Sequence, residues 1–504
     1  MKNRIICVLL IISMLVVSFG AQGIKIKKNR HHQHLEAMEK TACTDHGEEK
    51  FCTHLPLLNI TTDDPMPDPF YWDENGNVVM TAEGSRVHND TMVGATVEYF
   101  DNNAENNHLD DVPTVSERAL IRNRGASSRE FDKKGYLLKF KKEDMISGKK
   151  VSLSGMTPDS EWVLHGPFLD KTLIRNYLCY NLAGEIMDYS PNVRFCEAFL
   201  NGEYIGVYLI VEKIERNDNG RIDIEKSNVD MATTSYIVKI DRRPEDLTES
   251  VETFSQYSYM AANRGENRGY YEIVYPGLKL TEEQKEYIKR DISKFEKTLY
   301  SFAYNDNEYG YKEYIDVDSF VDYFLINEFT LNYDAMGLST YLYRDIGDKM
   351  KLCVWDFNSA FDLYEESLVQ PETFSLQNSM WYSYLFKDKD FVDRVVKRYF
   401  ELRDTFFDEE YMMNYIDETI AYLGPAIDRN YEKWGYSFNS EYNGVVYDRL
   451  YPEERNPRSY EEAVEQLKTC IQNRIVHMDS HIERLYTLCH DSLNKSYNYT
   501  KEKK

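Results

Sequence analysis

The amino-acid sequence predicts an α+β fold of two lobes, with a β-rich first half and a mostly helical second half. Two patterns predict it. Short runs of β-branched and aromatic residues, bounded by Asp, Asn, Gly or Pro, recur between residues 55 and 275. From Thr281 onward, apolar residues recur at helical spacing instead, and one hairpin pattern interrupts them. In a chain of this kind we expect the functional site to lie between the two lobes.

Length and charge limit the classes of function. The chain has 504 residues, of which 42% are hydrophobic, enough for a large core. Its formal net charge is −25. A nucleic-acid partner is therefore not expected, because phosphate neutralisation needs clustered Lys and Arg. Any phosphate group that binds this chain would need local basic residues within an acidic surface.

The N-terminus has the pattern of a secretory signal peptide over residues 1–23. Lys2 and Arg4 precede the apolar run 5–19, and small residues follow up to Gly23. A membrane anchor is the alternative, but the run is short for a bilayer span. After removal of this segment we expect a secreted chain without an integral membrane span.

Polar segments flank the rest of the chain. Residues 24–54 include His31, His32 and His34, and their composition favours a flexible arm over a metal site. Residues 491–504 are predicted to be a polar tail.

The cysteines show no zinc-ligand spacing. Cys43 and Cys52 enclose a short polar loop and are candidates for a local disulfide in an oxidising compartment. Cys470 and Cys489 lie on helical patterns and form a second candidate pair. The other cysteines of the mature chain lie in apolar contexts that favour burial: Cys179, Cys196 and Cys353.

The first half is predicted to contain a series of strands and one helix. The helix covers 170–186, with Asp170 as N-cap. Asn201-Gly202, between two apolar runs, is the strongest hairpin signal. The strands are predicted at 55–61, 78–81, 91–100, 119–124, 136–141, 193–200, 204–211, 235–240 and 270–274.

A Gly/Ser-rich loop joins two of these strands. Its backbone amides and hydroxyls, with adjacent lysines, are suited to hold phosphate oxygens. By itself the segment favours a solvated hairpin with surface lysines over a phosphate site. The residues concerned are Arg124, Gly125, Ser127, Ser128, Lys134 and Lys139.

The second half is predicted to be helical around one hairpin. Thr281 and Gln284 fit a capping box, and Asp318 is a candidate cap for the next helix. Further helices are predicted at 391–407, 411–423 and 460–488. The hairpin pairs 340–343 with 350–355.

Two acids bracket this hairpin. Asp334 precedes its first strand, and Asp356 and Asn358 follow its second strand. Protein kinases use such a pair, with one carboxylate orienting the attacking hydroxyl and the other holding magnesium on the nucleotide phosphates. A helix-terminal aspartate and a strand-end aspartate are the alternative readings of the two residues.

Several segments, in order, resemble the CotH family. The resemblance covers roughly residues 55–490 and implies a protein-kinase-like fold, with an N-terminal lobe over about 55–245 and a C-terminal lobe over about 275–490. The matching segments are LPLLNITTDD (55–64), RNRGASSREFDKKGYLLKF (122–140), DKTLIRNYLCYNLA (170–183), FLNGEYIGVYLIVEKI (199–214), YIDVDSFVDYFLINEFTLNYDA (314–335), STYLYRD (339–345) and VWDFNSAF (354–361).

The resemblance implies a secreted atypical Ser/Thr protein kinase. Such an enzyme transfers the γ-phosphate of ATP, with Mg²⁺ or Mn²⁺, to spore-coat or surface proteins and to itself. Asp334 then corresponds to the catalytic acid and Asp356 to the metal-binding acid. The loop residues named above correspond to the nucleotide-binding loop, and Glu212 would position one of its lysines.

The chain departs from the family pattern at the metal. Asn358 stands where a second acid is expected, and Asp362 where glycine is common. Ser339 stands where a protein kinase places a metal-binding Asn. The implied metal ligands are therefore Asp356, Asn358 and Ser339, since an Asn carbonyl oxygen can still bind magnesium.

Two other functions remain open from the sequence. One is a non-catalytic spore-coat protein or surface adhesin that uses the same fold for binding, since fold does not fix function. The other is nucleotidyl transfer, in which the same phosphate-binding groups act at the α-phosphate.

Overall fold

The computed structural model divides the chain into two compact units, Met1–Arg30 and His31–Lys504. It describes residues 30–37, 40, 51–81, 84–217, 221–242, 247–257, 269–363, 374–439, 441, 450 and 453–490. The predicted signal peptide, the predicted tail and Cys43 lie outside the described residues. The helices and strands of the described residues lie in the second unit.

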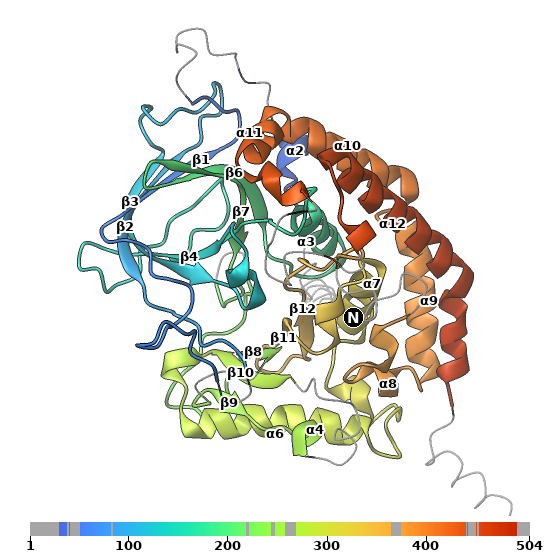
Figure 1. Ribbon diagram of the computed structural model, residues 1–504. Helices are drawn as coiled ribbons and strands as arrows, with labels where there is room; N and C mark the ends of the chain where they lie inside the picture. Colours follow the sequence, from blue (N-terminus) through green and yellow to red (C-terminus); the bar gives the residue numbers. More distant parts are fainter. Residues whose placement is uncertain are drawn as a thin grey trace, which may run out of the picture. The chain divides into compact units, whose positions relative to one another are not determined.

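A closed β-barrel forms the first part of this unit (Figure 1). Its strand order is β1-β2-β3-β4-β5-β7-β6, and every neighbouring pair is antiparallel except β1 and β6. Closure leaves no open sheet edge. The strands are β1 Leu57–Thr62, β2 Val93–Phe100, β3 Val115–Arg124, β4 Gly135–Phe140, β5 Glu161–His165, β6 Val193–Leu200 and β7 Glu203–Glu212.

Both faces of the barrel wall are buried at β4, β5 and β7. Leu138, Trp162 and Ile210 fill the barrel interior. Val163 and Val211 face outward and join the apolar cluster that the helices share. Burial on both faces explains why β7 reads as a nearly continuous apolar run rather than as an alternating strand.

A second sheet contains the predicted hairpin. Its strand order is β12-β11-β8-β10-β9, and Leu342 of β11 lies opposite Leu352 of β12. The hairpin prediction is therefore confirmed. The second strand of the hairpin is shorter than predicted and ends at Cys353. The strands are β8 Tyr236–Asp241, β9 Ser250–Val251, β10 Tyr270–Tyr275, β11 Thr340–Arg344 and β12 Lys351–Cys353.

Helices dominate the C-terminal part, so the α+β class with a sheet-rich first part is confirmed. The helices α9, α10 and α12 lie on the opposite side from the barrel in Figure 1. None of the described helices combines the length and the apolar character needed to cross a bilayer. The helices are α2 Gln33–Glu36, α3 Arg175–Ile186, α4 Phe254–Tyr257, α6 Glu282–Leu299, α7 Val317–Phe329, α8 Tyr382–Leu385, α9 Lys389–Arg403, α10 Glu409–Leu423, α11 Pro425–Trp434 and α12 Tyr460–His481.

Local capping signals were accurate to within a few residues. The Thr281–Gln284 capping box forms at the start of α6. The predicted cap Asp318 is wrong, because Asp316 accepts the N–H of Ser319 and caps α7. Asp170 does not cap α3 directly; its carboxylate accepts the N–H of Arg175 and shapes the turn before the helix.

Other elements differ from the prediction. The strand predicted at 78–81 is reduced to isolated bridges, and β5, α8 and α11 were not predicted. Cys470 and Cys489 are both free thiols, so the proposed pairing of these two is wrong. Cys179, Cys196 and Cys353 are buried as predicted.

Part of the segment predicted to be a flexible arm packs against the folded unit. His32 is buried, with Nε2 2.9 Å from Glu185 Oε1 and Nδ1 2.9 Å from the Tyr415 hydroxyl. Gln33 exchanges hydrogen bonds with the backbone of Phe195. These residues therefore connect α3, α10 and β6.

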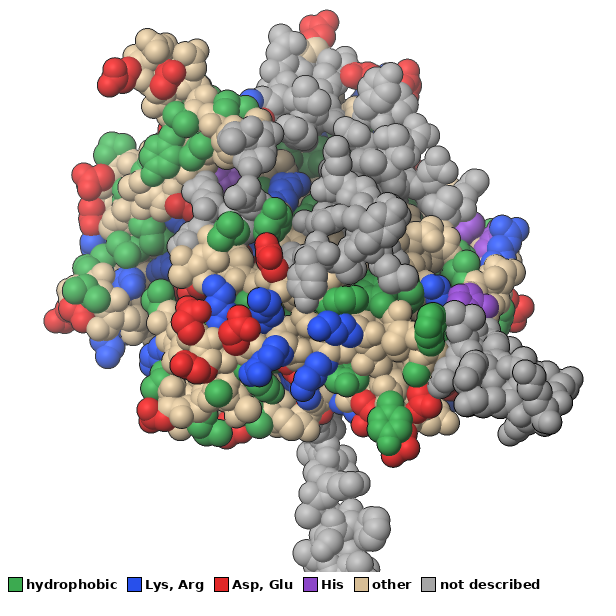
Figure 2. Space-filling view, turned by 90° about the horizontal axis from the view of Figure 1, so that it is seen from below, with side chains coloured by type: hydrophobic (Ala, Val, Ile, Leu, Met, Phe, Trp, Pro, Cys, Tyr) green, Lys and Arg blue, Asp and Glu red, His purple; other side chains and the backbone are tan. Residues whose placement is uncertain are grey.

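The surface carries charges of both signs. α6 lies at the bottom of Figure 1, and the view from that side shows Lys and Arg side chains among Asp and Glu side chains (Figure 2). On α6 itself, Lys289 lies 3.6 Å from Glu286. This face therefore has the mixed charge of an ordinary solvated surface.

Candidate functional site

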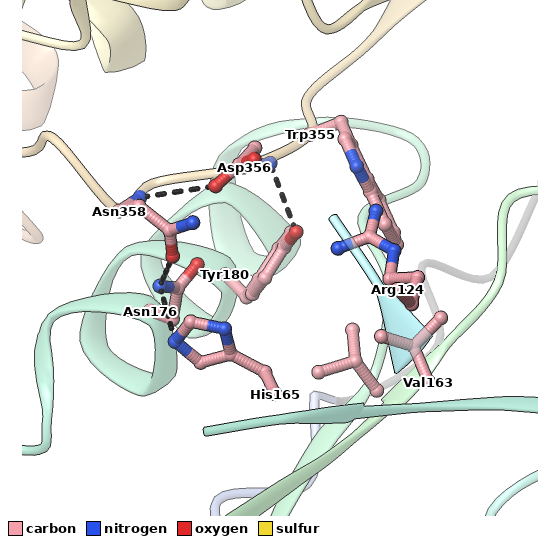
Figure 3. A pocket seen from close by; sticks show the side chains of 9 residues that line it. Arg124, Val163, His165, Asn176, Tyr180, Trp355, Asp356 and Asn358 are labelled. Atoms are coloured by element: carbon pink, nitrogen blue, oxygen red, sulfur yellow. Dashed lines mark hydrogen bonds between the residues drawn. The ribbon is translucent and has the colours of Figure 1, made fainter. Parts of the chain in front are cut away.

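A small hollow lies where the barrel meets α3 and the loop after β12 (Figure 3). β3, β5 and β7 supply one wall, and α3 and the loop supply the other. Apolar side chains of β5 and β7 meet there with polar side chains from β3, β5, α3 and the loop. The lining residues are Arg124, Val163, His165, Asn176, Tyr180, Val211, Trp355, Asp356 and Asn358.

The loop after β12 has an unusual backbone that α3 holds in place. Asp356 has a φ of 60°, in the left-handed region. Its N–H donates to the Tyr180 hydroxyl at 3.0 Å, and the N–H of Phe357 donates to Asn176 Oδ1 at 3.1 Å. The Asp356 carboxylate then accepts the N–H of Asn358 at 3.2 Å. Two α3 side chains thus hold the backbone that carries the Asp356 carboxylate, and the N–H of Asn358 holds the carboxylate itself.

Asn176 connects three parts of the site. Its Nδ2 lies 2.7 Å from Asn358 Oδ1 and 3.2 Å from His165 Nε2, while its Oδ1 accepts from Phe357. Asn176 is 4% exposed. Because every one of its polar atoms is engaged, its orientation is fixed.

Asp334 does not line the hollow, but the charge of Asp356 acts on it. Asp334 is half-buried in a 3₁₀ turn, Tyr333–Met336, before β11. Burial and the negative charge of Asp356 raise the pKa of Asp334 to about 7. Burial also raises the pKa of Asp356, against the opposing charge of Arg124. Two carboxylates whose pKa values are both raised by burial, one of them also by the charge of the other, form a site that attracts a cation.

Arg124 brings positive charge to the same hollow. It ends β3, and its guanidinium lies 5.1 Å from the ring centroid of Trp355, the residue before Asp356. This contact is a cation–π pair between the barrel and the loop. The barrel therefore places a cation beside the paired acids.

The Gly/Ser loop that follows Arg124 is tightly folded. Gly125 has a φ of 121°, and a Cβ there would lie 2.1 Å from Ser128 Oγ, so this position requires glycine. Ser127 and Ser128 begin a 3₁₀ turn. The buried Arg129 closes the loop by donating to Gly125 O at 2.7 Å. None of these loop residues lines the hollow.

The predicted lysines and Glu212 have other partners. Lys134 Nζ donates to Arg129 O at 2.9 Å. The Glu212 carboxylate is fully buried and accepts from Asn192 rather than from a lysine. Glu161 is the acid that meets the lysines, with Lys139 at 3.0 Å and Lys213 at 2.6 Å.

Comparison with known proteins places this geometry in a family. The sequence model of the family described as "CotH kinase protein" matches residues 121–478, more than half of the chain. The chain belongs to the CotH kinase family. It is also similar to the inner spore coat protein H of Bacillus subtilis (strain 168), with 23% identity over 249 residues. That match covers 49% of this chain and 60% of the relative's length.

A CotH kinase implies a nucleotide and a divalent cation, and the acids of this site offer the cation oxygen ligands. In the described part of the chain, no three His, Cys, Asp or Glu side chains gather as a metal site. Magnesium, however, is commonly bound by one or two carboxylates, with waters and substrate phosphates completing its shell. The paired Asp334 and Asp356 fit that pattern. Asn358 Oδ1 already accepts from Asn176, but a carbonyl oxygen has a second lone pair.

The predicted site residues are only partly brought together. Arg124, Asp356 and Asn358 meet at the hollow, and Asp334 lies outside it, where the charge of Asp356 raises its pKa. Ser339 is buried before β11, with a φ of 47°, and does not line it. Lys139 does not line it either, because it lies on β4 opposite Glu161, at the other end of β5 from His165.

Sequence reasoning missed His165, Asn176, Tyr180 and Glu161. For the two α3 residues a signal existed, because the predicted helix at 170–186 carries polar residues among its apolar ones. The residues of α3 are buried almost all round, so its polar side chains need partners. For His165 and Glu161 no local signal existed, because β5 itself was not predicted.

Proposed function

We propose that this CotH family member is an atypical Ser/Thr protein kinase that transfers the γ-phosphate of Mg-ATP to coat or surface proteins and to itself. The observation that carries the proposal is the pair of acids at the hairpin: burial raises the pKa of both, the charge of Asp356 raises that of Asp334 further, and Asp356 shares the hollow with Arg124. Phosphoryl transfer needs this combination of carboxylates and positive charge around a phosphate.

In this proposal the two acids have separate roles. Asp334, with its pKa near neutrality, orients the acceptor hydroxyl and accepts its proton. Asp356 holds Mg²⁺ or Mn²⁺ together with Asn358, and Ser339 is the further ligand that the family pattern suggests. The bound ion would neutralise charge on the phosphate oxygens.

The barrel side would hold the nucleotide. Arg124 neutralises phosphate charge, and the Gly125 loop with Ser127 and Ser128 supplies donors near it. Lys139 is oriented by Glu161, while Lys134 stabilises the loop backbone. The barrel and the helical part then correspond to the two lobes of a kinase-like fold.

The location of the protein follows from two indications. The leader-like residues 1–23 favour export, and the similar Bacillus subtilis protein is named as an inner spore coat protein. We therefore place the protein at a spore coat or cell surface, with coat or surface proteins as acceptors.

The test is transfer of label from γ-labelled ATP in Mg²⁺ or Mn²⁺. We expect the purified protein to label itself or a coat-type acceptor. Asp356→Asn and Asp334→Asn should each reduce the rate by roughly 10²-fold or more, because each removes a charge needed in the transition state. Asp318→Asn, at an exposed ion pair on α7, is the matched control and should leave the rate unchanged.

The other outcomes separate the alternatives. Equal labelling by wild type and Asp356→Asn would contradict the site. Mass analysis of the product that finds AMP in place of phosphate would establish nucleotidyl transfer. A wild-type protein that neither labels nor binds ATP would favour the non-catalytic coat or adhesin function.

A further inference from the structure

The hydrogen bonds around His165 determine which of its two ring nitrogens carries the proton. It is the last residue of β5 and follows Val163 on the outer face of the barrel wall. Its Nε2 lies 3.2 Å from Asn176 Nδ2. Because Asn176 Oδ1 accepts the N–H of Phe357, the amide nitrogen must face His165. An amide nitrogen only donates, so Nε2 is the acceptor and the ring proton lies on Nδ1.

The protonated Nδ1 faces the hollow. Figure 3 shows this nitrogen on the side of the ring away from Asn176, toward the space between Tyr180 and the barrel residues Val163 and Arg124. No described group accepts a hydrogen bond from it. Burial and the nearby Arg124 lower the pKa of His165 to about 3, so the ring stays neutral and keeps a single N–H.

The barrel wall of the hollow offers a ligand hydrogen-bond donors and no hydrogen-bond acceptor. Besides His165, the barrel contributes the guanidinium of Arg124 and the apolar side chains of Val163 and Val211. The acceptors, Asp356 and Asn358, lie on the opposite wall. A ligand that fits between them carries oxygen acceptors toward the barrel and binds a cation toward Asp356, as a metal-bound polyphosphate does.

We propose that His165 is a phosphate-binding residue, which donates its Nδ1–H to a phosphate oxygen of the nucleotide beside Arg124. Asn176 is the positioning residue, because it fixes the tautomer of His165 and at the same time the orientation of Asn358. The proposal rests on the proposed nucleotide-dependent function and names a contact within that site.

The test measures binding without turnover. Calorimetry with Mg²⁺ would compare ATP, inorganic tripolyphosphate and adenosine on wild type and on His165→Phe, which keeps a ring and removes its nitrogens. We expect His165→Phe to weaken ATP and tripolyphosphate roughly 10-fold, as for the loss of one hydrogen bond to a charged group, and to leave adenosine unchanged. His54→Phe is the matched control, since its ring also bonds a single partner, Tyr422 O, outside the hollow.

A second measurement covers the case in which His165→Phe fails to fold. Nitrogen NMR of wild type with labelled histidine should show the His165 proton on Nδ1, and this resonance should shift when tripolyphosphate binds. Unchanged ATP affinity in a folded His165→Phe, or no shift of Nδ1, would overturn the inference and leave the proposed function standing. A wild type that binds neither ATP nor tripolyphosphate would overturn both.

Discussion

The backbone of Asp356 shows how single residues are strained at this site. A left-handed φ costs a non-glycine residue on the order of 1–3 kcal/mol, and such residues persist where surrounding contacts enforce them. Ser339, Phe361 and Asp362 share this conformation. At Asp362 the φ of 63° explains why glycine is common in the family pattern, and Arg455 holds the residue by donating to its carbonyl and its carboxylate.

Asp334 should make the stability of the protein depend on pH. Its folded pKa of about 7 exceeds the unfolded value of about 3.9. The folded state therefore binds more protons between these values, and stability falls as pH rises through them. Asp334→Asn removes this cost, so we expect it to stabilise the metal-free protein by roughly 1–3 kcal/mol at pH 8 and by almost nothing at pH 4.

Chemical denaturation across this pH range, without divalent cations, measures the effect. Asp318→Asn, which changes an exposed carboxylate, should show no such pH-dependent gain. An Asp334→Asn protein that is no more stable than wild type at pH 8 would contradict the burial and charge coupling of the two acids.

At the scale of elements, α3 organises the site. This helix has no distinct apolar face and polar face, because nearly all of its residues are buried. Arg175 donates to Ala360 O and to Asp170, so α3 also holds the far end of the loop after β12. The helix thus acts as a rigid support for a loop whose own backbone is strained.

Removing the Tyr180 hydroxyl should weaken metal binding in addition to lowering the stability of the fold. Tyr180→Phe leaves the N–H of Asp356 without its acceptor, which costs about 1–3 kcal/mol for a buried group. Tyr382→Phe is a matched control, because its equally buried hydroxyl donates to Phe320 O away from the site. We expect both variants to lose stability to a similar extent, and only Tyr180→Phe to bind Mn²⁺ with ATP more weakly. Equal Mn²⁺ affinity in both would argue against a positioning role for α3.

At the scale of the whole folded unit, one apolar cluster connects the barrel wall to the helices. A buried ion pair lies within the helical part. Arg474 of α12 donates to the carboxylate of Glu328 on α7 at 2.7 Å and to the carbonyl of Glu328 at 2.8 Å. Glu328 also accepts the N–H groups of Ser375 and Leu376. This pair connects α12 to the helix that leads to Asp334.

Breaking the pair should cost far more than breaking a surface pair. Arg474→Met leaves the Glu328 carboxylate buried and uncompensated, so we expect a loss of roughly 3–5 kcal/mol in unfolding free energy. Arg403→Met, which breaks the more exposed contact with Asp479, should cost about 1 kcal/mol or less. Urea denaturation of the two variants compares them, and similar losses would contradict the dominant role of the buried pair.

Local chemistry allowed much of the fold to be predicted. The Asn201-Gly202 turn adopts the positive φ angles that its residues favour, and the Thr281 capping box forms as expected. Hydrophobic spacing located the main helices and the hairpin at 340–353. These features depend on residues near one another in the chain, so their sequence signals survive without tertiary information.

The sequence by itself determined the α+β class, the hairpin and the two acids that bracket it. Only the tertiary structure decided which other groups meet Asp356. Asn176 and Asn358 are 182 residues apart, and Glu161 rather than Glu212 meets Lys139 because β4 and β5 pair in register. Such contacts depend on how strands and helices pack rather than on local pattern, and for that reason His165 became visible as a site residue only in the folded chain.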